Sequence, residues 1–195
     1  MTSRRLSQAI SEGEGISLIA RVDGLEAARD AEAHGADAVA AVAPLDGLRT
    51  ATRLPIIWAV QGDVTDAMTD GADAYLIAVA PDEEEEADYL QNRHRAATSA
   101  GLECVFEIGD SESLERALES VDPEVLLLNG GAPGADALEN LLELLSEVPA
   151  GKLVIAELEE PTRDEVLELQ RVGVDAVLVR SASVQGLAEA EPPDV

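Results

Sequence analysis

Short apolar segments alternate along the chain with longer stretches in which apolar residues recur at helical spacing. Eight segments are rich in Val, Ile, Leu and Ala and are bounded by turn or helix signals, which predicts buried strands. They cover residues 16–22, 38–43, 56–60, 74–80, 102–108, 125–128, 153–156 and 176–179. The stretches between them predict helices at 25–34, 82–99, 112–121, 135–147 and 166–172. After the second and third strands, only one or two helical turns are expected.

Capping residues and a repeated motif mark the ends of these helices. Ser111 is expected to cap one helix, and Thr162 with Glu165 has the spacing of a capping box. The motif Gly-x-Asp-Ala begins three strands, at residues 35–38, 71–74 and 173–176. Its glycine is predicted to end the preceding helix in the left-handed conformation, and the apolar residues after it predict a strand of a parallel sheet.

The alternation of eight strands with helices predicts a (β/α)8 TIM barrel, an α/β fold, of small size and with trimmed loops. A doubly wound open sheet is the competing fold, but no Gly-x-Gly-x-x-Gly follows the first strand. We expect one domain over residues 1–195, with a short N-terminal extension (1–15) and an acidic C-terminal tail (187–195).

The net charge of the chain restricts the classes of partner that it is expected to bind. Forty acidic and 13 basic residues give a formal net charge of −27, and Lys152 is the only lysine. Phosphates would be repelled, so we expect no nucleic acid and no membrane as partner. Such acidity is typical of a halophilic cytoplasm, where salt screens self-repulsion; an acidic protein from a GC-rich genome is the alternative. The single cysteine, Cys104, lies in a strand pattern and predicts a buried thiol rather than a disulfide.

We expect a cytoplasmic protein, because no apolar stretch is long enough to span a membrane and residues 1–6 lack the apolar core of a signal peptide. Nothing in the sequence predicts a cofactor, and a homo-oligomer stays open. Both histidines, His34 and His94, are expected to face solvent.

In a (β/α)8 barrel, active-site and binding residues lie at the carboxyl ends of the strands. Polar candidates occur there on the first, fifth, sixth, seventh and eighth strands: Arg21, Asp23, Glu107, Asn129, Glu157, Arg180 and Ser181. Glu107 follows a strongly apolar strand, so partial burial would suit it to acid–base chemistry. The alternative is a structural ion pair with Arg21 or Arg180.

The residues at these strand ends also suggest a phosphate site and a metal site. Exposed amides of the glycine-rich loop at residues 129–134 would hold a phosphate, although such loops are commonly simple turns. Asp23, Glu107 and Glu157 would hold Mg²⁺ if the barrel brought them together, but no short-spaced metal loop is present, and we expect no metal.

The order of these segments resembles the indole-3-glycerol phosphate synthase family of phosphate-binding barrels. The resemblance runs from Ile16 to about Val184 and is best in the second half, at residues 101–118, 126–129, 153–157 and 173–181. It implies a catalytic glutamate at Glu107, a substrate-positioning asparagine at Asn129, and at Glu157 the glutamate that opens the family's Glu-Ser-Gly motif. It also implies a carboxy-lyase of tryptophan biosynthesis that closes an indole ring with loss of CO2 and water.

The chain departs from the family pattern where catalysis requires it. Arg21 and Asp23 stand where the family has a glutamate and a lysine, and Ala59 stands at the likely position of a general-acid lysine. Leu158 and Glu159 replace a Ser-Gly phosphate contact, and Arg180 replaces a phosphate-binding glycine beside Ser181. Loss of each general acid is expected to lower the rate of the family reaction by about 10²–10⁴-fold.

Three hypotheses therefore stand. The first is a divergent barrel that acts on or binds a small metabolite, phosphorylated ones included, with the parental lyase activity lost. Glu107 would then be acid or base, Asn129 would orient the substrate, and Arg21 with Arg180 would clamp an anion. The second is a non-catalytic ligand-binding or interaction barrel. The third is an authentic indole-3-glycerol phosphate synthase.

Overall fold

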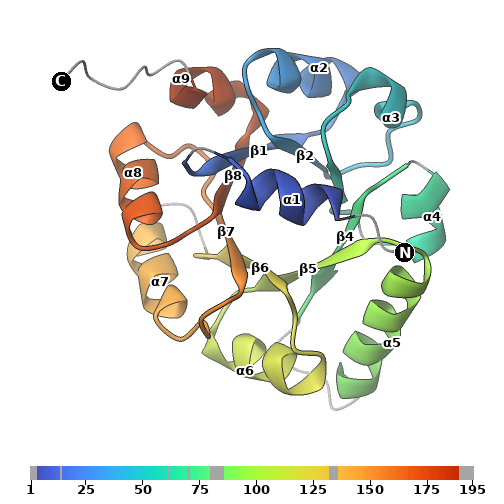
Figure 1. Cartoon of the computed structure of the whole chain (residues 1–195), viewed down its shortest axis with the longest axis vertical. Helices are drawn as coiled ribbons and strands as arrows, with labels where there is room; N and C mark the ends of the chain where they lie inside the picture. The colour runs from blue at the N-terminus through green and yellow to red at the C-terminus, as the bar shows by residue number, and fades with distance from the viewer. Residues whose placement is uncertain are drawn as a thin grey trace.

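The computed structural model describes residues 4–13, 15–60, 62–69, 71–79, 86–131 and 136–188. Eight parallel strands form a closed barrel in which each strand pairs with the next and β8 pairs with β1 (Figure 1). The strands are β1 (Ser17–Val22), β2 (Ala38–Ala41), β3 (Ile56–Trp58), β4 (Ala74–Ala78), β5 (Glu103–Ile108), β6 (Val125–Asn129), β7 (Leu153–Glu157) and β8 (Ala176–Arg180). The predicted (β/α)8 barrel is confirmed.

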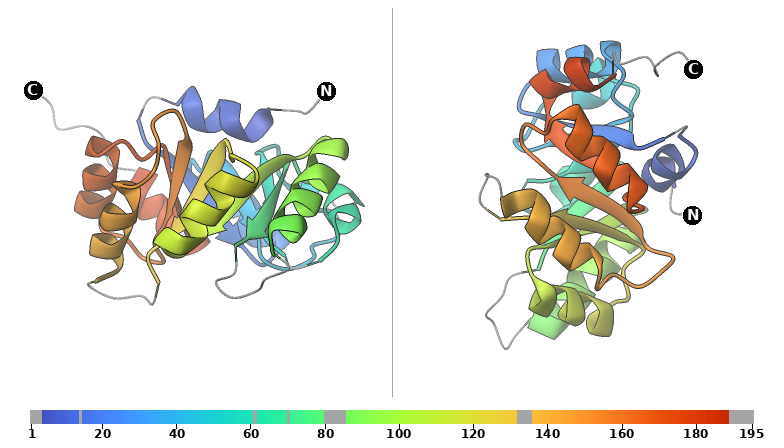
Figure 2. Two further views of the ribbon diagram at one scale, coloured as in Figure 1. Left: turned by 90° about the horizontal axis from the view of Figure 1, so that it is seen from below. Right: turned by 90° about the vertical axis from the view of Figure 1, so that its left-hand side faces the viewer.

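Helices surround the barrel, and one helix closes an end of it. The outer helices are α2 (Leu25–Ala33), α3 (Leu48–Ala51), α4 (Val64–Thr69), α5 (Glu86–Ser99), α6 (Ser111–Ser120), α7 (Asp136–Leu145), α8 (Arg163–Arg171) and α9 (Val184–Ala188), with a 3-10 turn, η1 (Ser181–Ser183). The brevity of α3 and α4 matches the prediction. Helix α1 (Arg5–Ser11) lies across one end of the barrel (Figures 1 and 2). Among the described residues, no helix is both long enough and apolar enough to cross a membrane.

Several predicted boundaries were wrong by a residue or more. The last three strands extend to Asn129, Glu157 and Arg180, because polar residues at the barrel mouth still pair in register with their neighbours. The cap of α6 is Asp110, not Ser111. The extended backbone of Asp110 lets its carboxylate accept the Ser113 N–H at 2.7 Å, while the Ser113 hydroxyl accepts the Asp110 N–H at 3.1 Å.

Other predictions about the ends of elements had mixed outcomes. The Thr162–Glu165 capping box is confirmed at α8. Residues 187 and 188, predicted as tail, belong to α9, and 82–85 and 189–195 lie outside the described residues.

Within the N-terminal extension, helix α1 forms the floor of the barrel. Leu6 and Ile10 of α1 are buried in one apolar cluster with the inward-facing residues of the strands. The buried Glu103 carboxylate, at the start of β5, accepts the Leu6 N–H at 2.7 Å and the Ser7 N–H at 3.1 Å. A carboxylate therefore satisfies free N–H groups in the first turn of the helix that packs on the barrel.

The Gly-x-Asp-Ala repeat clamps pairs of neighbouring strands at the same end. The glycines have φ values of 90°, 74° and 96°, so the left-handed conformation is confirmed. Each aspartate donates its backbone N–H to a carbonyl of the preceding strand, and its carboxylate accepts that same residue's N–H. The pairs are Asp37 with Leu18 (2.8 and 2.8 Å), Asp73 with Ile56 (2.9 and 3.0 Å) and Asp175 with Val154 (3.0 and 2.7 Å).

The alanine of each motif makes room for α1. Ala38, Ala74 and Ala176 are fully buried, and they share the inner cluster with Leu6 and Ile10. A larger side chain at these strand starts would occupy volume that α1 now fills. One motif thus supplies the helix stop, the strand clamp and the space for the floor helix.

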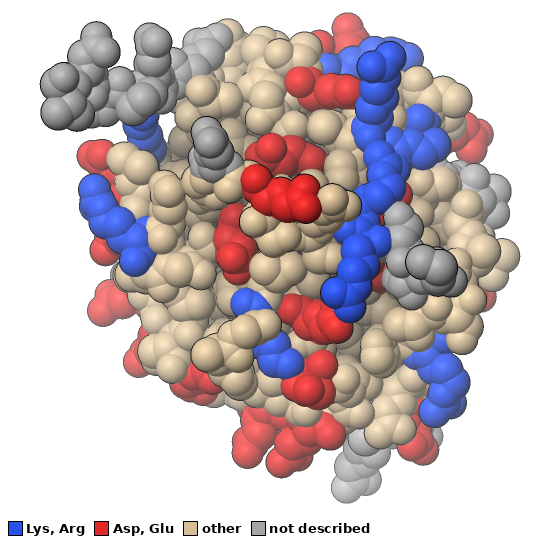
Figure 3. Space-filling model, viewed as in Figure 1, with Lys and Arg blue, Asp and Glu red and all other residues tan. Residues whose placement is uncertain are grey.

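Basic side chains form a stripe past acidic ones on the face that carries α1 (Figure 3). Arg5 and Arg49 each donate to the buried Asp73 carboxylate at 2.9 Å, and Arg4 pairs with Glu124 at 3.2 Å. Asp73 therefore links α1, α3 and the second copy of the repeat.

Candidate functional site at the barrel mouth

A cleft of about 440 Å³ lies at the carboxyl ends of the strands. Five of the seven predicted site residues line it: Arg21, Glu107, Asn129, Glu157 and Arg180. Asp23 is exposed just beyond β1, and Ser181 begins η1; neither lines this cleft. The structure therefore assembles most of the predicted set in one place.

The alternation of side-chain direction along each strand makes these five side chains point toward the inside of the barrel. The inner apolar cluster contains the residues two positions earlier on each of the five strands: Ile19, Val105, Leu127, Ile155 and Leu178. Because side chains alternate faces along a strand, the next inward position on each strand is a mouth residue. The polar layer thus rests directly on an apolar core.

Glu107 and Asn129 form a hydrogen-bonded pair on neighbouring strands. The Asn129 Nδ2 donates to Glu107 Oε1 at 3.3 Å, and Asn129 Oδ1 accepts the Gly131 N–H at 2.9 Å. Both side chains are half-buried. Gly131 fixes which end of the amide faces Glu107, so the pair offers a carboxylate held in a defined orientation.

The two arginines are engaged by glutamates of the segment that ends β7. Arg21 forms an ion pair with Glu157, and Arg180 pairs with Glu160 at 3.0 Å and Glu159 at 3.7 Å. Arg21 and Arg180 are register partners on β1 and β8, so these acidic residues offset two adjacent positive charges. The expected alternative, in which Glu107 is the partner of either arginine, is not the pairing found.

Acidic residues dominate the cleft. Five glutamates and two arginines line it, and the acidic set is Glu107, Glu157, Glu159, Glu160 and Glu165. Glu159, Glu160 and Glu165 were not among the predicted site residues. The signal that could have found Glu165 was its own capping box, which places the start of α8 at the mouth. The Thr162 hydroxyl and N–H lower the pKa of the Glu165 carboxyl.

The glycine-rich loop has a packing role in its described part. A Cβ on Gly130 would lie 2.4 Å from the Ala137 carbonyl oxygen of α7, and the Asn140 amide donates to the Gly130 carbonyl at 3.1 Å. Residues 132–134 of the predicted phosphate loop lie outside the described residues. Across the described part of the chain, no three His, Cys, Asp or Glu residues lie close enough together to hold a metal.

Lysine is absent from the mouth. Lys152 immediately precedes β7, at the opposite end of the barrel, and its Nζ lies 2.5 Å from Asp122 Oδ1. Ala59 follows β3 and lies at the carboxyl end of that strand. The predicted placement of the single lysine away from the strand ends is confirmed.

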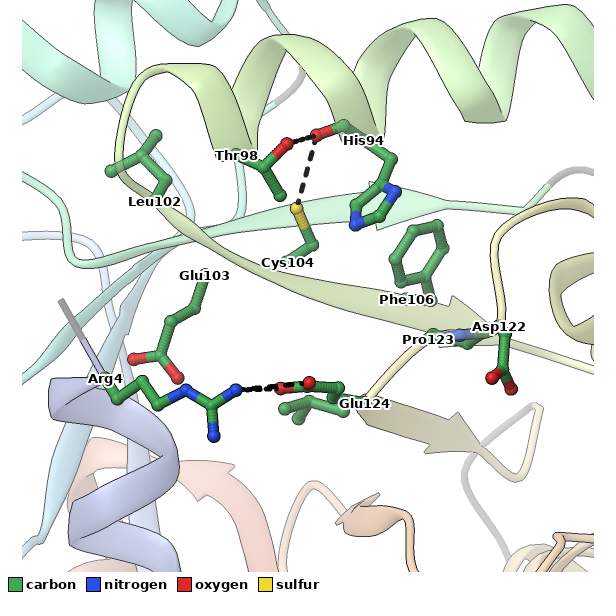
Figure 4. Close-up of a pocket in the computed structure, with 11 residues that line it drawn as sticks. Arg4, His94, Thr98, Leu102, Glu103, Cys104, Phe106, Asp122, Pro123 and Glu124 are labelled. Carbon is green, nitrogen blue, oxygen red and sulfur yellow. Dashed lines mark hydrogen bonds and ion pairs between the residues drawn. The ribbon is translucent and has the colours of Figure 1, made fainter. Parts of the chain in front are cut away.

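A second hollow, of about 250 Å³, lies beside α5 and the starts of β5 and β6 (Figure 4). His94 packs edge-on against Phe106 with ring centroids 5.9 Å apart and is half-buried, so it faces solvent only in part. Cys104 is half-buried, and burial raises the pKa of its thiol to about 12. The hollow therefore presents a protonated thiol rather than a nucleophile.

Comparison with known proteins identifies the family. A family model described as indole-3-glycerol phosphate synthase matches residues 56–188. The chain belongs to the indole-3-glycerol phosphate synthase family. A synthase from Acidithiobacillus ferrooxidans is 33% identical over 132 residues, which cover 67% of this chain and 48% of the relative. A synthase from Geobacillus sp. is 29% identical over 143 residues, covering 69% and 54%.

The chain thus spans about half the length of these indole-3-glycerol phosphate synthases. A solved structure of the N-acetylmannosamine-6-phosphate 2-epimerase from Clostridium perfringens superposes with a TM-score of 0.66 at 16% identity, over 88% of each chain. At that identity the likeness is one of fold.

Proposed function

We propose that this barrel is a divergent member of its family that binds a small polar metabolite at the mouth and does not close the indole ring. The observation that carries the proposal is the Glu107–Asn129 pair, held in a cleft from which lysine is absent. Glu107 would contact the ligand as a hydrogen-bond acceptor or general base, and Asn129 would orient it.

Loss of the family reaction is argued from the missing acids. The resemblance implies two lysine acids, and Arg21, Asp23 and Ala59 occupy the corresponding region of this chain. An arginine stays protonated at neutral pH and is a poor proton donor. Two missing general acids would lower the rate by about 10⁴–10⁸-fold, taking 10²–10⁴ for each.

A phosphorylated ligand, one of the expectations from the sequence, receives less support from the cleft. A phosphate would meet five glutamates, and both arginines already have carboxylate partners. A non-catalytic barrel remains the second candidate function. It is favoured by the ion pairs that link the carboxyl end of β7 to β1 and β8, because they already engage both arginines of the barrel mouth.

The first experiment tests the lyase. The purified chain is incubated with the carboxyphenylamino substrate of the family, beside the Acidithiobacillus ferrooxidans synthase as positive control. We expect no indole-3-glycerol phosphate above the rate without enzyme. Formation at a rate within about 100-fold of the control would overturn the proposal, because that loss corresponds to less than the two missing acids.

A second experiment tests the site itself. Native mass spectrometry of the protein incubated with a metabolite extract is expected to reveal a bound small molecule that Glu107→Gln loses. Glu143→Gln is the matched control, because Glu143 is exposed on α7 and does not line the cleft. A ligand retained equally by both variants would place binding elsewhere.

A further inference from the structure

The charged residues that line the cleft indicate which class of ligand it would bind. We infer that the mouth selects a small organic cation, such as a primary amine, over an anion of the same size. This inference rests on the proposed function, since it assigns a ligand class to that same cleft.

The first step is the pairing of the arginines. Arg21 is held by Glu157 and Arg180 by Glu159 and Glu160, all three on the segment that ends β7. A ligand anion would have to displace a carboxylate that is already in place. The two guanidiniums that would otherwise clamp an anion are therefore offset by the protein itself.

The second step is the state of Glu107. Within the described part of the chain, its carboxylate accepts one hydrogen bond, from Asn129 Nδ2 at 3.3 Å, and pairs with neither mouth arginine. It is half-buried on the inner face of β5, above the buried Val105. A half-buried carboxylate with lone pairs left over favours a ligand that supplies N–H donors and positive charge.

The third step is the field inside the cleft. The lining carries five carboxylates against two guanidiniums, within a chain of net charge −27. Clefts lined by one sign of charge focus the potential and concentrate ions of the opposite sign. A volume of about 440 Å³ suits a small metabolite. The paired arginines, the free acceptor positions of Glu107 and the acidic lining of the cleft all favour a positively charged ligand.

A matched series of four-carbon probes tests the inference: 1,4-diaminobutane, 1,4-butanediol and succinate, which differ mainly in charge. Binding is measured by isothermal titration calorimetry at low salt, and the position by NMR shifts of the mouth amides. We expect the diamine to bind, to shift the Glu107 and Asn129 amides, and to bind more tightly than the diol or succinate.

Variants separate a site from general attraction to an acidic surface. Glu107→Gln is expected to lower the affinity for the diamine by about tenfold or more, because it removes a charged hydrogen-bond partner. Glu143→Gln removes one equal charge outside the cleft and is expected to leave affinity unchanged. Asn129→Asp adds a carboxylate beside Glu107 and is expected to strengthen binding. Thermal unfolding checks that each variant is folded.

Three outcomes would overturn the inference. They are tighter binding of succinate than of the diamine, no shift of the mouth amides by the diamine, and an equal effect of Glu107→Gln and Glu143→Gln on the affinity for the diamine. If succinate binds best at the mouth, the ligand class is wrong while the proposed site stands. If no probe shifts the mouth amides and no metabolite is retained in the mass-spectrometry experiment, the proposed function fails as well.

Discussion

The floor helix offers a sharp test of the packing argument. Leu6 is fully buried in the inner cluster, so Leu6→Ala removes about three methyl or methylene groups from a close-packed site. At about 0.8 kcal/mol for each group, the transfer cost is about 2.4 kcal/mol, and the cavity left behind raises it to about 3 kcal/mol. For a domain of this size, each kcal/mol lowers Tm by about 2–4 °C, so we expect a fall of about 6–12 °C.

The assay is thermal unfolding followed by circular dichroism, at one salt concentration for all variants. Ser11→Ala is the matched control, because Ser11 lies on the same helix but is exposed. The control is expected to stay within about 0.5 kcal/mol of the parent protein. A Leu6→Ala Tm no lower than that of Ser11→Ala would show that α1 does not support the barrel, and the floor interpretation would be abandoned.

Three further predictions concern charge and reactivity. The lowered pKa of Glu165 gives stability that is present above its ordinary value of 4.5 and is lost as pH falls through the folded value, so the Tm difference between the parent and Glu165→Gln should shrink on acidification. Cys104, with a pKa of about 12, should react with a thiol reagent at neutral pH far more slowly in the folded than in the unfolded protein. With a net charge of −27, Tm should rise with KCl concentration; a flat or falling curve would contradict the halophilic interpretation.

The fold was predictable because its signals are local. Buried strands, helix periodicity and the repeated glycine each occupy a few consecutive residues, and each predicts one element. The strand ends were less predictable, because Asn129, Glu157 and Arg180 are polar yet still pair in register. Helix α1 was missed because seven residues with two buried side chains carry a weak pattern, and its partner, Glu103, lies far away in the sequence.

The mouth residues were predictable for a related reason. Topology alone brings the carboxyl ends of parallel strands together, so five residues could be placed in one cleft from strand position. Their pairing could not be, because two arginines and several glutamates allow many combinations in sequence. Only the register of β8 beside β1, with β7 next to it, assigns Arg21 to Glu157 and Arg180 to Glu159 and Glu160.

The aspartate clamps of the repeat also bear on how the barrel is assembled. Each clamp joins a strand to the one immediately before it, across only 19, 17 or 21 residues. Closing such short loops costs little chain entropy, and contacts close in sequence favour rapid folding. The pairs β1–β2, β3–β4 and β7–β8 are therefore βαβ modules that can lock before the ring is complete. We therefore expect closure of the barrel to join modules that have already formed, so that the motif that ends a helix would also set the unit of assembly.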